Sequence, residues 1–138
     1  MASDSRLKYR AEWIYVGWSL VALVIYLSVT STPPQLDIEF KYLDKLEHLF
    51  AYAVLMGWFG QLYHTQKSRI GYLLGFIAMG IGLEIIQGVG GVRYFEYGDI
   101  AANSIGAAIG WGMSRGRGAD LLKLFEHWVL PRRSSERD

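Results

Sequence analysis

The chain has 138 residues, of which 51% are hydrophobic, 14% aromatic and 20% charged, and its formal net charge is +1. This composition is too apolar for an ordinary small soluble domain, and the net charge gives no reason to expect a nucleic-acid partner. Because cysteine is absent, disulfides, thiolate metal sites and a cysteine nucleophile are excluded.

Four apolar stretches follow one another along the chain and are separated by charged residues. They cover residues 13–30, 49–63, 70–86 and 100–113. A helix needs about 20 residues, within a range of roughly 17 to 25, to cross the hydrocarbon core of a membrane. The first and third stretches have this length, whereas the second and fourth reach it only with the preceding polar residues 44–48 and 97–99. We therefore expect an all-α fold, an integral membrane four-helix bundle over residues 13–115.

The first stretch is expected to remain in the protein as a span. A cleaved signal peptide is the alternative, but its apolar core is typically only about 7 to 15 residues long. Trp13, Tyr15 and Trp18 also have the character of an aromatic anchor at the membrane interface. After this span, Pro33 and Pro34 end the helix and favour an extended connection to the next one.

The second span opens with polar residues that helical spacing places together. Asp44, His48 and Tyr52 lie four residues apart and share one face, and Lys45 stands beside them. Asp44 and Glu47 have the spacing of a capping box, in which both side chains bind free N–H groups at the helix start. His48 is either a hydrogen-bonded residue of the helix or, within a larger cluster, a ligand or base.

The third span ends with two polar residues, Glu84 and Gln87, which share a face. Glu84 stands near the negative, C-terminal end of the helix dipole, where a carboxylate is disfavoured. We therefore expect Glu84 to be protonated or to have a cationic partner, either Lys45 or Arg93 of the following loop. A purely structural ion pair is the alternative to a functional site.

The fourth span begins with Asp99 and Asn103, on the same face as Gly106. Asp99 is either a site residue or only the N-cap of the helix. Because Asn103 and Ser104 make this span less apolar, a re-entrant segment is the alternative.

Small residues form stripes on two of the spans, Gly71 and Gly75 on the third and Ala102, Gly106 and Gly110 on the fourth. Such stripes let helix backbones approach closely in lipid. We expect both stripes to be contacts between helices.

The last part of the chain, residues 116–138, is expected to be a cytoplasmic amphipathic helix and a basic tail. Gly116 and Gly118 interrupt the chain before this helix. The apolar face of the helix contains Leu121, Leu122, Leu124, Phe125, Trp128 and Val129. We expect the helix to lie on the membrane surface and the tail to be attracted by anionic headgroups. Packing on the cytoplasmic end of the bundle is the alternative.

The basic residues predict the orientation of the spans. Of the 14 Lys and Arg, eleven lie before the first span, between the second and third, or after the fourth, and only Lys41, Lys45 and Arg93 lie on the other side. The positive-inside rule therefore places both termini, including residues 1–12, in the cytoplasm. It places the polar residues of the second, third and fourth spans together at the extracytoplasmic end. A re-entrant fourth segment would leave the basic tail outside.

The polar motifs follow one another in a set order: DKLEHLFAY at 44–52, EIIQ at 84–87, then Arg93, Asp99, Asn103, Gly106 and Gly110. In this order they resemble the VanZ-like family, which takes its name from a protein associated with teicoplanin resistance. The resemblance covers roughly residues 10–115 and implies a multi-pass protein of the bacterial inner membrane with four or five spans. The signature positions that it implies are Lys45, His48, Glu84, Gln87, Arg93, Asp99 and Asn103.

Two functions are compatible with this cluster. In the first, which we favour because no motif dictates a reaction, the outward site binds a lipid headgroup, a cell-envelope precursor or an envelope protein, and so modulates glycopeptide susceptibility. Lys45 and Arg93 would hold an anionic group there. The expected binding residues are Asp44, Lys45, His48, Tyr52, Glu84, Gln87, Arg93, Asp99 and Asn103.

In the second, the chain is a membrane enzyme that acts on a lipid-linked substrate. His48 or Glu84 would act as general base, and Lys45 or Arg93 would stabilise developing negative charge. The catalytic candidates are His48, Glu84 and Asp99, which would also be the ligands of a metal in this case. We expect no resident metal or other cofactor.

Overall fold

The computed structural model describes residues 7–30 and 42–130, and all regular elements of this part of the chain are helices, so the predicted all-α fold is confirmed. The elements are α1 (Arg10–Val29), α2 (Leu43–Leu62), α3 (Gln66–Val89), α4 (Tyr97–Met113), the 3-10 helix η1 (Gly116–Asp120) and α5 (Leu121–Val129). The long helices include the polar residues 44–48 and 97–99, as predicted. The proline connection and the basic tail lie outside the described residues.

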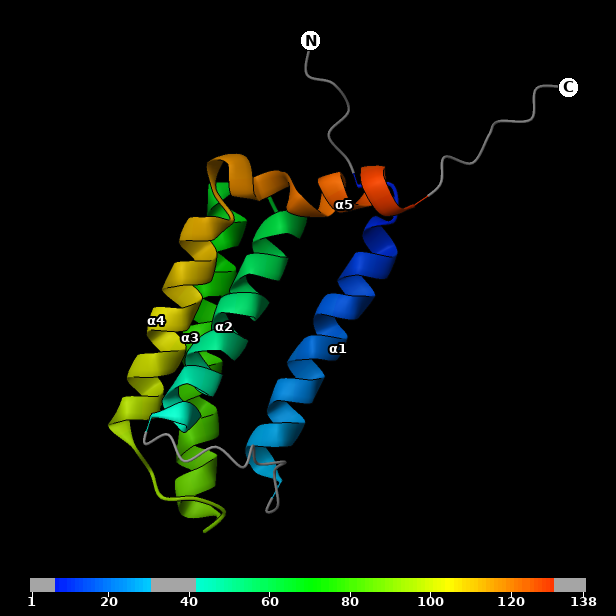
Figure 1. Cartoon of the computed structure of the whole chain (residues 1–138). Coiled ribbons are helices and arrows are strands. Elements are labelled where there is room, and N and C mark those ends of the chain that lie inside the picture. The colour runs from blue at the N-terminus through cyan, green and yellow to red at the C-terminus, as the bar shows by residue number, and fades with distance from the viewer. Residues whose placement is uncertain (1–6, 31–41, 131–138) are drawn as a thin grey trace, which may run out of the picture.

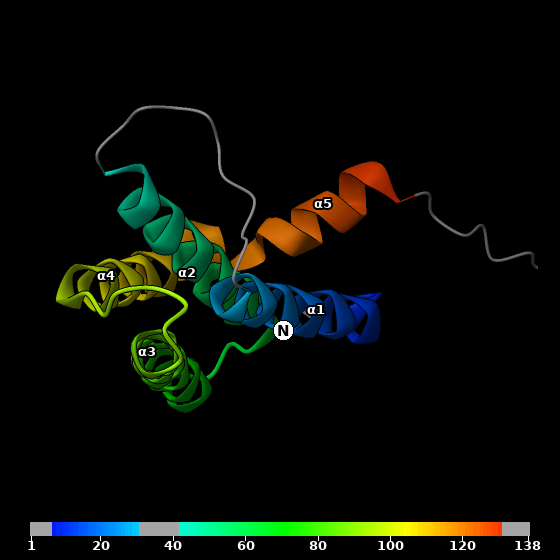
Figure 2. The ribbon, with the colours of Figure 1, turned by 90° about the horizontal axis from the view of Figure 1, so that it is seen from below.

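The central helix of the bundle is α2. Viewed along the helices, α2 lies between α1 and α4, and α3 packs on a third side (Figure 2). Helix α5 lies across the end of the bundle at which α1 begins and α2 ends, whereas α2 and α4 begin at the opposite end (Figure 1). The polar residues that open α2 and α4 are thereby placed together, far from α5.

The backbones of α2 and α4 approach very closely. A Cβ atom on Gly106 would stand 2.1 Å from the carbonyl oxygen of Leu49, and one on Gly110 would stand 2.3 Å from that of Ala53. Because no side chain fits at either distance, both positions require glycine. The predicted contact through the small residues of α4 is therefore confirmed.

The small residues of α3 behave differently. Gly71 and Gly75 have no atom within 4 Å of the place where a Cβ would stand, so the predicted helix contact there is wrong within this chain. Helix α3 turns another face toward its neighbours, which carries Gly80. A Cβ on Gly80 would lie 3.0 Å from Asn103 Nδ2 and 3.3 Å from the ring of Tyr52.

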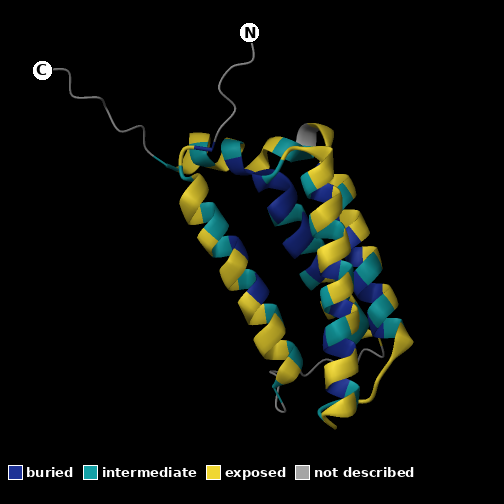
Figure 3. Cartoon of the chain, turned by 180° about the vertical axis from the view of Figure 1, so that it is seen from behind, coloured by how far each residue is buried: buried dark blue, intermediate teal, exposed yellow. Residues whose placement is uncertain are grey.

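Figure 3 shows which residues of the bundle are exposed and which are buried; many of the exposed ones are large and apolar, and several of the buried ones are polar. Phe50 is 70% exposed, Leu74 60% and Val89 86%. Among residues 7–30 and 42–130, the buried polar side chains are Gln61, Arg69, Glu84, Gln87, Asp99, Asn103 and Ser114. The core also contains apolar side chains such as Leu55, Met56 and Phe59, so the feature that departs from a water-soluble bundle is the large exposed apolar surface together with the buried polar groups. Among the described residues, α1 and α3 are the two helices long and apolar enough to cross a membrane.

A carboxylate of α5 caps the start of α1. Tyr9, the N-cap residue of α1, makes no side-chain capping hydrogen bond. Instead, Glu126 accepts hydrogen bonds from the backbone N–H of Lys8 at 2.8 Å, the backbone N–H of Tyr9 at 3.0 Å and the indole N–H of Trp13 at 2.6 Å. Glu126 thus binds the free N–H of Tyr9 at the helix start and the N–H of Lys8 immediately before it.

Helix α5 also packs on the bundle through Leu122, which is buried with Leu7 and Leu62. The other apolar side chains of α5 are largely exposed, with Leu121 at 54% and Trp128 at 77%. These contacts agree with the alternative prediction for this helix, in which it packs on the end of the bundle. Its exposed apolar residues are still available to a membrane surface.

Candidate polar binding site

Polar side chains from α2, α3, α4 and the loop between α3 and α4 meet at the end of the bundle opposite α5. We call this group the polar cluster. Its members are Asp44, Lys45, His48, Glu84, Arg93, Glu96, Asp99 and Asn103. The predicted gathering of ionisable groups at one end of the bundle is therefore present.

Lys45 connects α2 with the start of α4. Its Nζ lies 2.8 Å from Asp99 Oδ1 and 2.5 Å from Glu96 Oε2. The lysine side chain passes over Gly98, where a Cβ would stand 2.8 Å from Lys45 Cε. A side chain at position 98 would require the end of the lysine side chain to shift.

Arg93 connects the loop with α2, because its Nη2 lies 2.5 Å from Asp44 Oδ1. The hydrogen bond to Asp44, and the nearby charges of Asp44, Asp99 and Glu84, raise the pKa of Arg93.

The capping box predicted for Asp44 and Glu47 is wrong. Helix α2 already begins at Leu43, so Asp44 stands inside its first turn and binds the guanidinium instead of a free N–H group.

Asp99 is also inside its helix and is not the N-cap. The N-cap of α4 is Glu96, which makes no side-chain capping hydrogen bond. The side chain of Asp99 is 3% exposed, and its two oxygens have separate neighbours. Oδ1 accepts from Lys45, whereas Oδ2 faces His48 Nε2 at 3.7 Å. Asp99 is therefore a member of the cluster and not a cap.

His48 is held by α4. Its Nδ1 lies 3.0 Å from Asn103 Oδ1, and since an amide oxygen only accepts hydrogen bonds, Nδ1 carries the proton in this contact. Nε2 faces two carboxylates, at 3.8 Å from Asp44 Oδ1 and 3.7 Å from Asp99 Oδ2. Both distances exceed the usual hydrogen-bond length of about 2.7 to 3.2 Å. One ring nitrogen is thus fixed and the other faces negative charge.

Glu84 is 1% exposed and has no ion pair among the described residues, because Lys45 and Arg93 pair with other carboxylates. Of the two predicted states of Glu84, the ion pair with Lys45 or Arg93 is therefore not formed, and the protonated state stays a prediction. Its Oε1 accepts a hydrogen bond from the backbone N–H of Glu96 at 2.7 Å. Its Oε2 is buried and has no hydrogen-bond partner. An unpaired buried carboxylate oxygen is costly and calls for an explanation.

Two predicted binding residues lie at the margin of the cluster. The amide nitrogen of Gln87 donates to the backbone carbonyl of Ser28 at 2.7 Å, so Gln87 holds the end of α1. Tyr52 is 1% exposed and lies one turn below His48, against Gly80. Both residues support the packing around the cluster.

Four carboxylates meet two permanent cations in the polar cluster. Lys45 and Arg93 are both paired, and the four carboxylates exceed the two cations by two negative charges when Glu84 is ionised.

Glu96 is the member of the polar cluster that was not predicted from the sequence. Glu96 lies in the loop before α4. The one nearby signal in the sequence is Gly98, two residues later, which lies against the Lys45 side chain.

In the part of the chain that the structure describes, one group of residues could share a metal ion. Asp44, His48 and Asp99 each offer a ligand atom, and these atoms all lie within 4.8 Å of one another. The predicted set of His48, Glu84 and Asp99 does not form among the described residues. The reason is that Glu84 is directed to the backbone of Glu96, while Asp44 occupies the place beside the histidine.

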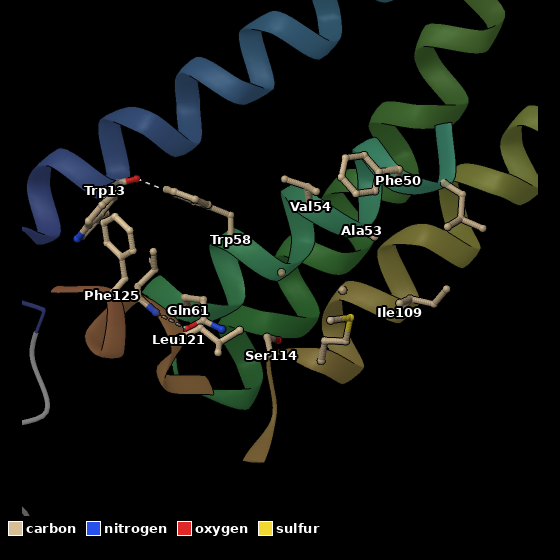
Figure 4. A pocket seen from close by; sticks show the side chains of 15 residues that line it. Trp13, Phe50, Ala53, Val54, Trp58, Gln61, Ile109, Ser114, Leu121 and Phe125 are labelled. Carbon is tan, nitrogen blue, oxygen red and sulfur yellow. Dashed lines mark hydrogen bonds between the residues drawn. The ribbon is translucent and has the colours of Figure 1, made fainter. Parts of the chain in front are cut away.

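An apolar groove of about 700 Å³ runs along α2. The groove begins at Leu49 and Phe50 of α2, one turn after Lys45. It follows the line where α2 and α4 meet and ends at Gln61 of α2 and Phe125 of α5 (Figure 4). Its other walls include Val54, Trp58, Ile109 and Met113. The groove was not predicted, because it depends on how α5 and Trp13 lie against α2 and not on any local motif.

Comparison with protein-family models, with curated proteins and with solved structures finds no match to this chain. The VanZ-like resemblance therefore rests on the polar motifs alone. Most of its signature positions are members of the polar cluster, so the resemblance and the geometry point to the same residues.

Proposed function

We propose that the chain is a multi-pass protein of the bacterial inner membrane in which α1 to α4 span the bilayer and both termini are cytoplasmic. Two helices have the length and apolarity of spans, and large apolar side chains point outward while polar ones are buried. The polar starts of α2 and α4 cover one another, which lowers the cost of placing them in the bilayer. The positive-inside bias puts the polar cluster at the extracytoplasmic end.

Membership of the VanZ-like family is part of this proposal. The support for it is the order of the motifs and the meeting of their side chains in one cluster. Glycopeptide susceptibility is then the cellular property that the protein modulates.

The function that the geometry supports best is binding of a membrane lipid with a phosphate-bearing headgroup. The observation that carries it is the position of the polar cluster directly beside the head of the apolar groove. Lys45 in the cluster and Leu49 in the groove are one helical turn apart on α2. An amphiphile could therefore place its headgroup in the cluster and its chain against Val54 and Ile109.

The headgroup must compete with the carboxylates of the protein. Lys45 and Arg93 are the cations that suit a phosphate, but each is paired with an aspartate. The Arg93 side chain is 35% exposed and comes from a loop, whereas the Asp99 that holds Lys45 is 3% exposed. Arg93 is therefore the group that can turn to a ligand most easily.

Mass spectrometry of lipids that co-purify with the protein tests this function. We expect Arg93→Ala to retain about tenfold less phosphate-bearing lipid, since a charge-assisted hydrogen bond contributes about 1.5 kcal/mol or more. Lys123→Ala is the matched control, because Lys123 is a cation at the other end of the bundle, where it pairs with Asp120. Equal lipid in wild type and both variants would refute the proposed function.

A membrane enzyme that acts on a lipid-linked substrate is the second candidate. The arrangement of His48 favours it, because a histidine oriented through one nitrogen by Asn103 has the other nitrogen available as a base. Release of a headgroup from a bound lipid, abolished in His48→Ala, would decide for the enzyme. Recovery of the intact lipid after prolonged incubation would decide for binding.

A further inference from the structure

The two carboxylates that face His48 are the same two that hold Arg93 and Lys45. We propose that Asp44, His48 and Asp99 form a binding site for a divalent cation of the zinc type, and that its occupation releases Arg93 from Asp44. The metal site stands on its own geometry. The use of the released Arg93 for a headgroup rests on the proposed lipid-binding function.

The distances fit a shared ion better than hydrogen bonds. His48 Nε2 lies 3.8 Å from Asp44 Oδ1 and 3.7 Å from Asp99 Oδ2. Zinc binds nitrogen at about 2.0 to 2.1 Å and carboxylate oxygen at about 2.0 to 2.2 Å, so two ligand atoms on a tetrahedral ion lie about 3.4 Å apart. The distances from His48 Nε2 to the two carboxylate oxygens exceed this separation by only about 0.3 to 0.4 Å.

The histidine is already oriented as a ligand. Metal-bound histidines usually donate their other ring N–H to an oxygen, which fixes the tautomer. Asn103 Oδ1 provides this oxygen for His48 Nδ1 at 3.0 Å. The lone pair of Nε2 then faces Asp44 and Asp99, where a cation could bind all three groups.

A second observation, independent of these three side chains, is the unpaired oxygen of Glu84. Glu84 is 1% exposed and its Oε2 has no partner. It belongs to the same cluster, since its Oε1 accepts from Glu96, whose carboxylate holds Lys45. The ligands Asp44 and Asp99 together carry two carboxylate groups, which matches the charge of one divalent ion.

The type of ion follows from the ligands. One imidazole with two carboxylates is a set that suits zinc, whereas magnesium and calcium prefer oxygen ligands alone. Three protein ligands leave one tetrahedral position open, as in sites where zinc binds a further small group. A phosphate oxygen of a headgroup could take this position.

Binding of a metal ion at this site would affect Arg93 and Lys45 differently. Arg93 and His48 face the same oxygen of Asp44, Oδ1, so an ion at this oxygen competes directly with the guanidinium. Lys45 binds Oδ1 of Asp99, whereas His48 faces Oδ2. An ion therefore displaces Arg93 and leaves Lys45 in place.

Titration of the purified, chelator-treated full chain in detergent with Zn²⁺ alone tests the site. We expect one Zn²⁺ per chain, and binding at least about tenfold weaker in His48→Ala and about tenfold weaker in Asn103→Ala, which removes only the orienting oxygen. His127→Ala is the control, because His127 is an exposed histidine of α5. Arg93→Ala should bind Zn²⁺ more tightly than wild type, because the competitor for Asp44 is gone.

Absence of Zn²⁺ binding by the wild type, or equal affinity in wild type and Asn103→Ala, would overturn the site. Unchanged or weaker affinity in Arg93→Ala would overturn the exchange of partners. Asn103→Ala and Arg93→Ala both keep the three ligands Asp44, His48 and Asp99. The test therefore does not depend on whether His48→Ala folds. Because the titration contains no lipid, failure of lipid binding with intact Zn²⁺ binding would refute the proposed function and leave the metal site.

Discussion

Glu126 is the residue whose contacts reach furthest along the chain, since it joins α5 to the start of α1. Its carboxylate accepts from the backbone of Lys8 and Tyr9 and from the Trp13 indole. We expect Glu126→Ala to lower the free energy of unfolding by about 2 kcal/mol, the range for an N-cap and for hydrogen bonds to a charged group. Thermal unfolding in detergent measures this. Glu12→Ala, an exposed acid in the first turn of α1, should change little.

The same contacts make this part of the stability depend on pH. Burial raises the pKa of Glu126, but the hydrogen bonds from Tyr9, Lys8 and Trp13 outweigh it, so the pKa lies below its usual value. A lowered pKa means that the stabilisation is complete above the pKa of the unfolded state, about 4.3, and is lost as pH falls through the folded value. The stability difference between wild type and Glu126→Ala should therefore shrink below about pH 4. A constant difference down to lower pH would contradict this.

At the residue scale, sequence spacing predicted which polar residues meet but not what each one binds. Helical spacing placed Asp44 and His48 on one face, and they are neighbours in the structure. The roles of Asp44 and Asp99 depend on where each helix starts. The N-caps lie two residues before Asp44 and three before Asp99, so both aspartates bind cations instead of capping a helix. Glu96 was not predicted because it lies in a loop, where helical spacing cannot show which residues share a face with it.

At the scale of the elements, the approach of α2 and α4 depends on Gly106. Because a Cβ there would stand 2.1 Å from the Leu49 carbonyl oxygen, we expect Gly106→Ala to cost about 1 to 3 kcal/mol of stability through overpacking. Gly71→Ala is a matched control, since nothing lies within 4 Å of its Cβ position. There the better helix propensity of alanine should raise stability by up to about 1 kcal/mol. Equal effects of both changes on thermal unfolding would contradict the packing.

The existence of the four long helices was predictable from the apolar stretches, and the polar flanks placed the starts of α2 and α4 closely. Helix α3 was predicted too short, since it extends four residues before and three residues after the stretch 70–86. Which small-residue stripe meets a neighbour was not. Gly71 and Gly75 have the same spacing as Gly106 and Gly110, and only the rotation of α3 in the bundle decides that they face outward. Rotation is set by tertiary packing around Gly80, which local sequence does not encode.

At the scale of the whole molecule, the orientation in the membrane can be tested directly because the chain contains no cysteine. Tyr94 is 92% exposed in the loop of the polar end, and Lys67 is exposed at the other end. We expect a membrane-impermeant maleimide to label Tyr94→Cys in intact spheroplasts and Lys67→Cys only after permeabilisation. The opposite pattern would place the polar cluster in the cytoplasm.

The central claim is that one lipid occupies both the polar cluster and the apolar groove, and filling the groove tests it most directly. Ile109 lines the groove, so Ile109→Trp should expel the chain, whereas Leu74→Trp places the same side chain on the exposed face of α3. The measurement is the amount of phosphate-bearing lipid per protein chain after purification, determined by mass spectrometry. We predict that Ile109→Trp loses most of this lipid and that Leu74→Trp retains the wild-type amount. Equal amounts in wild type and both variants would contradict the account.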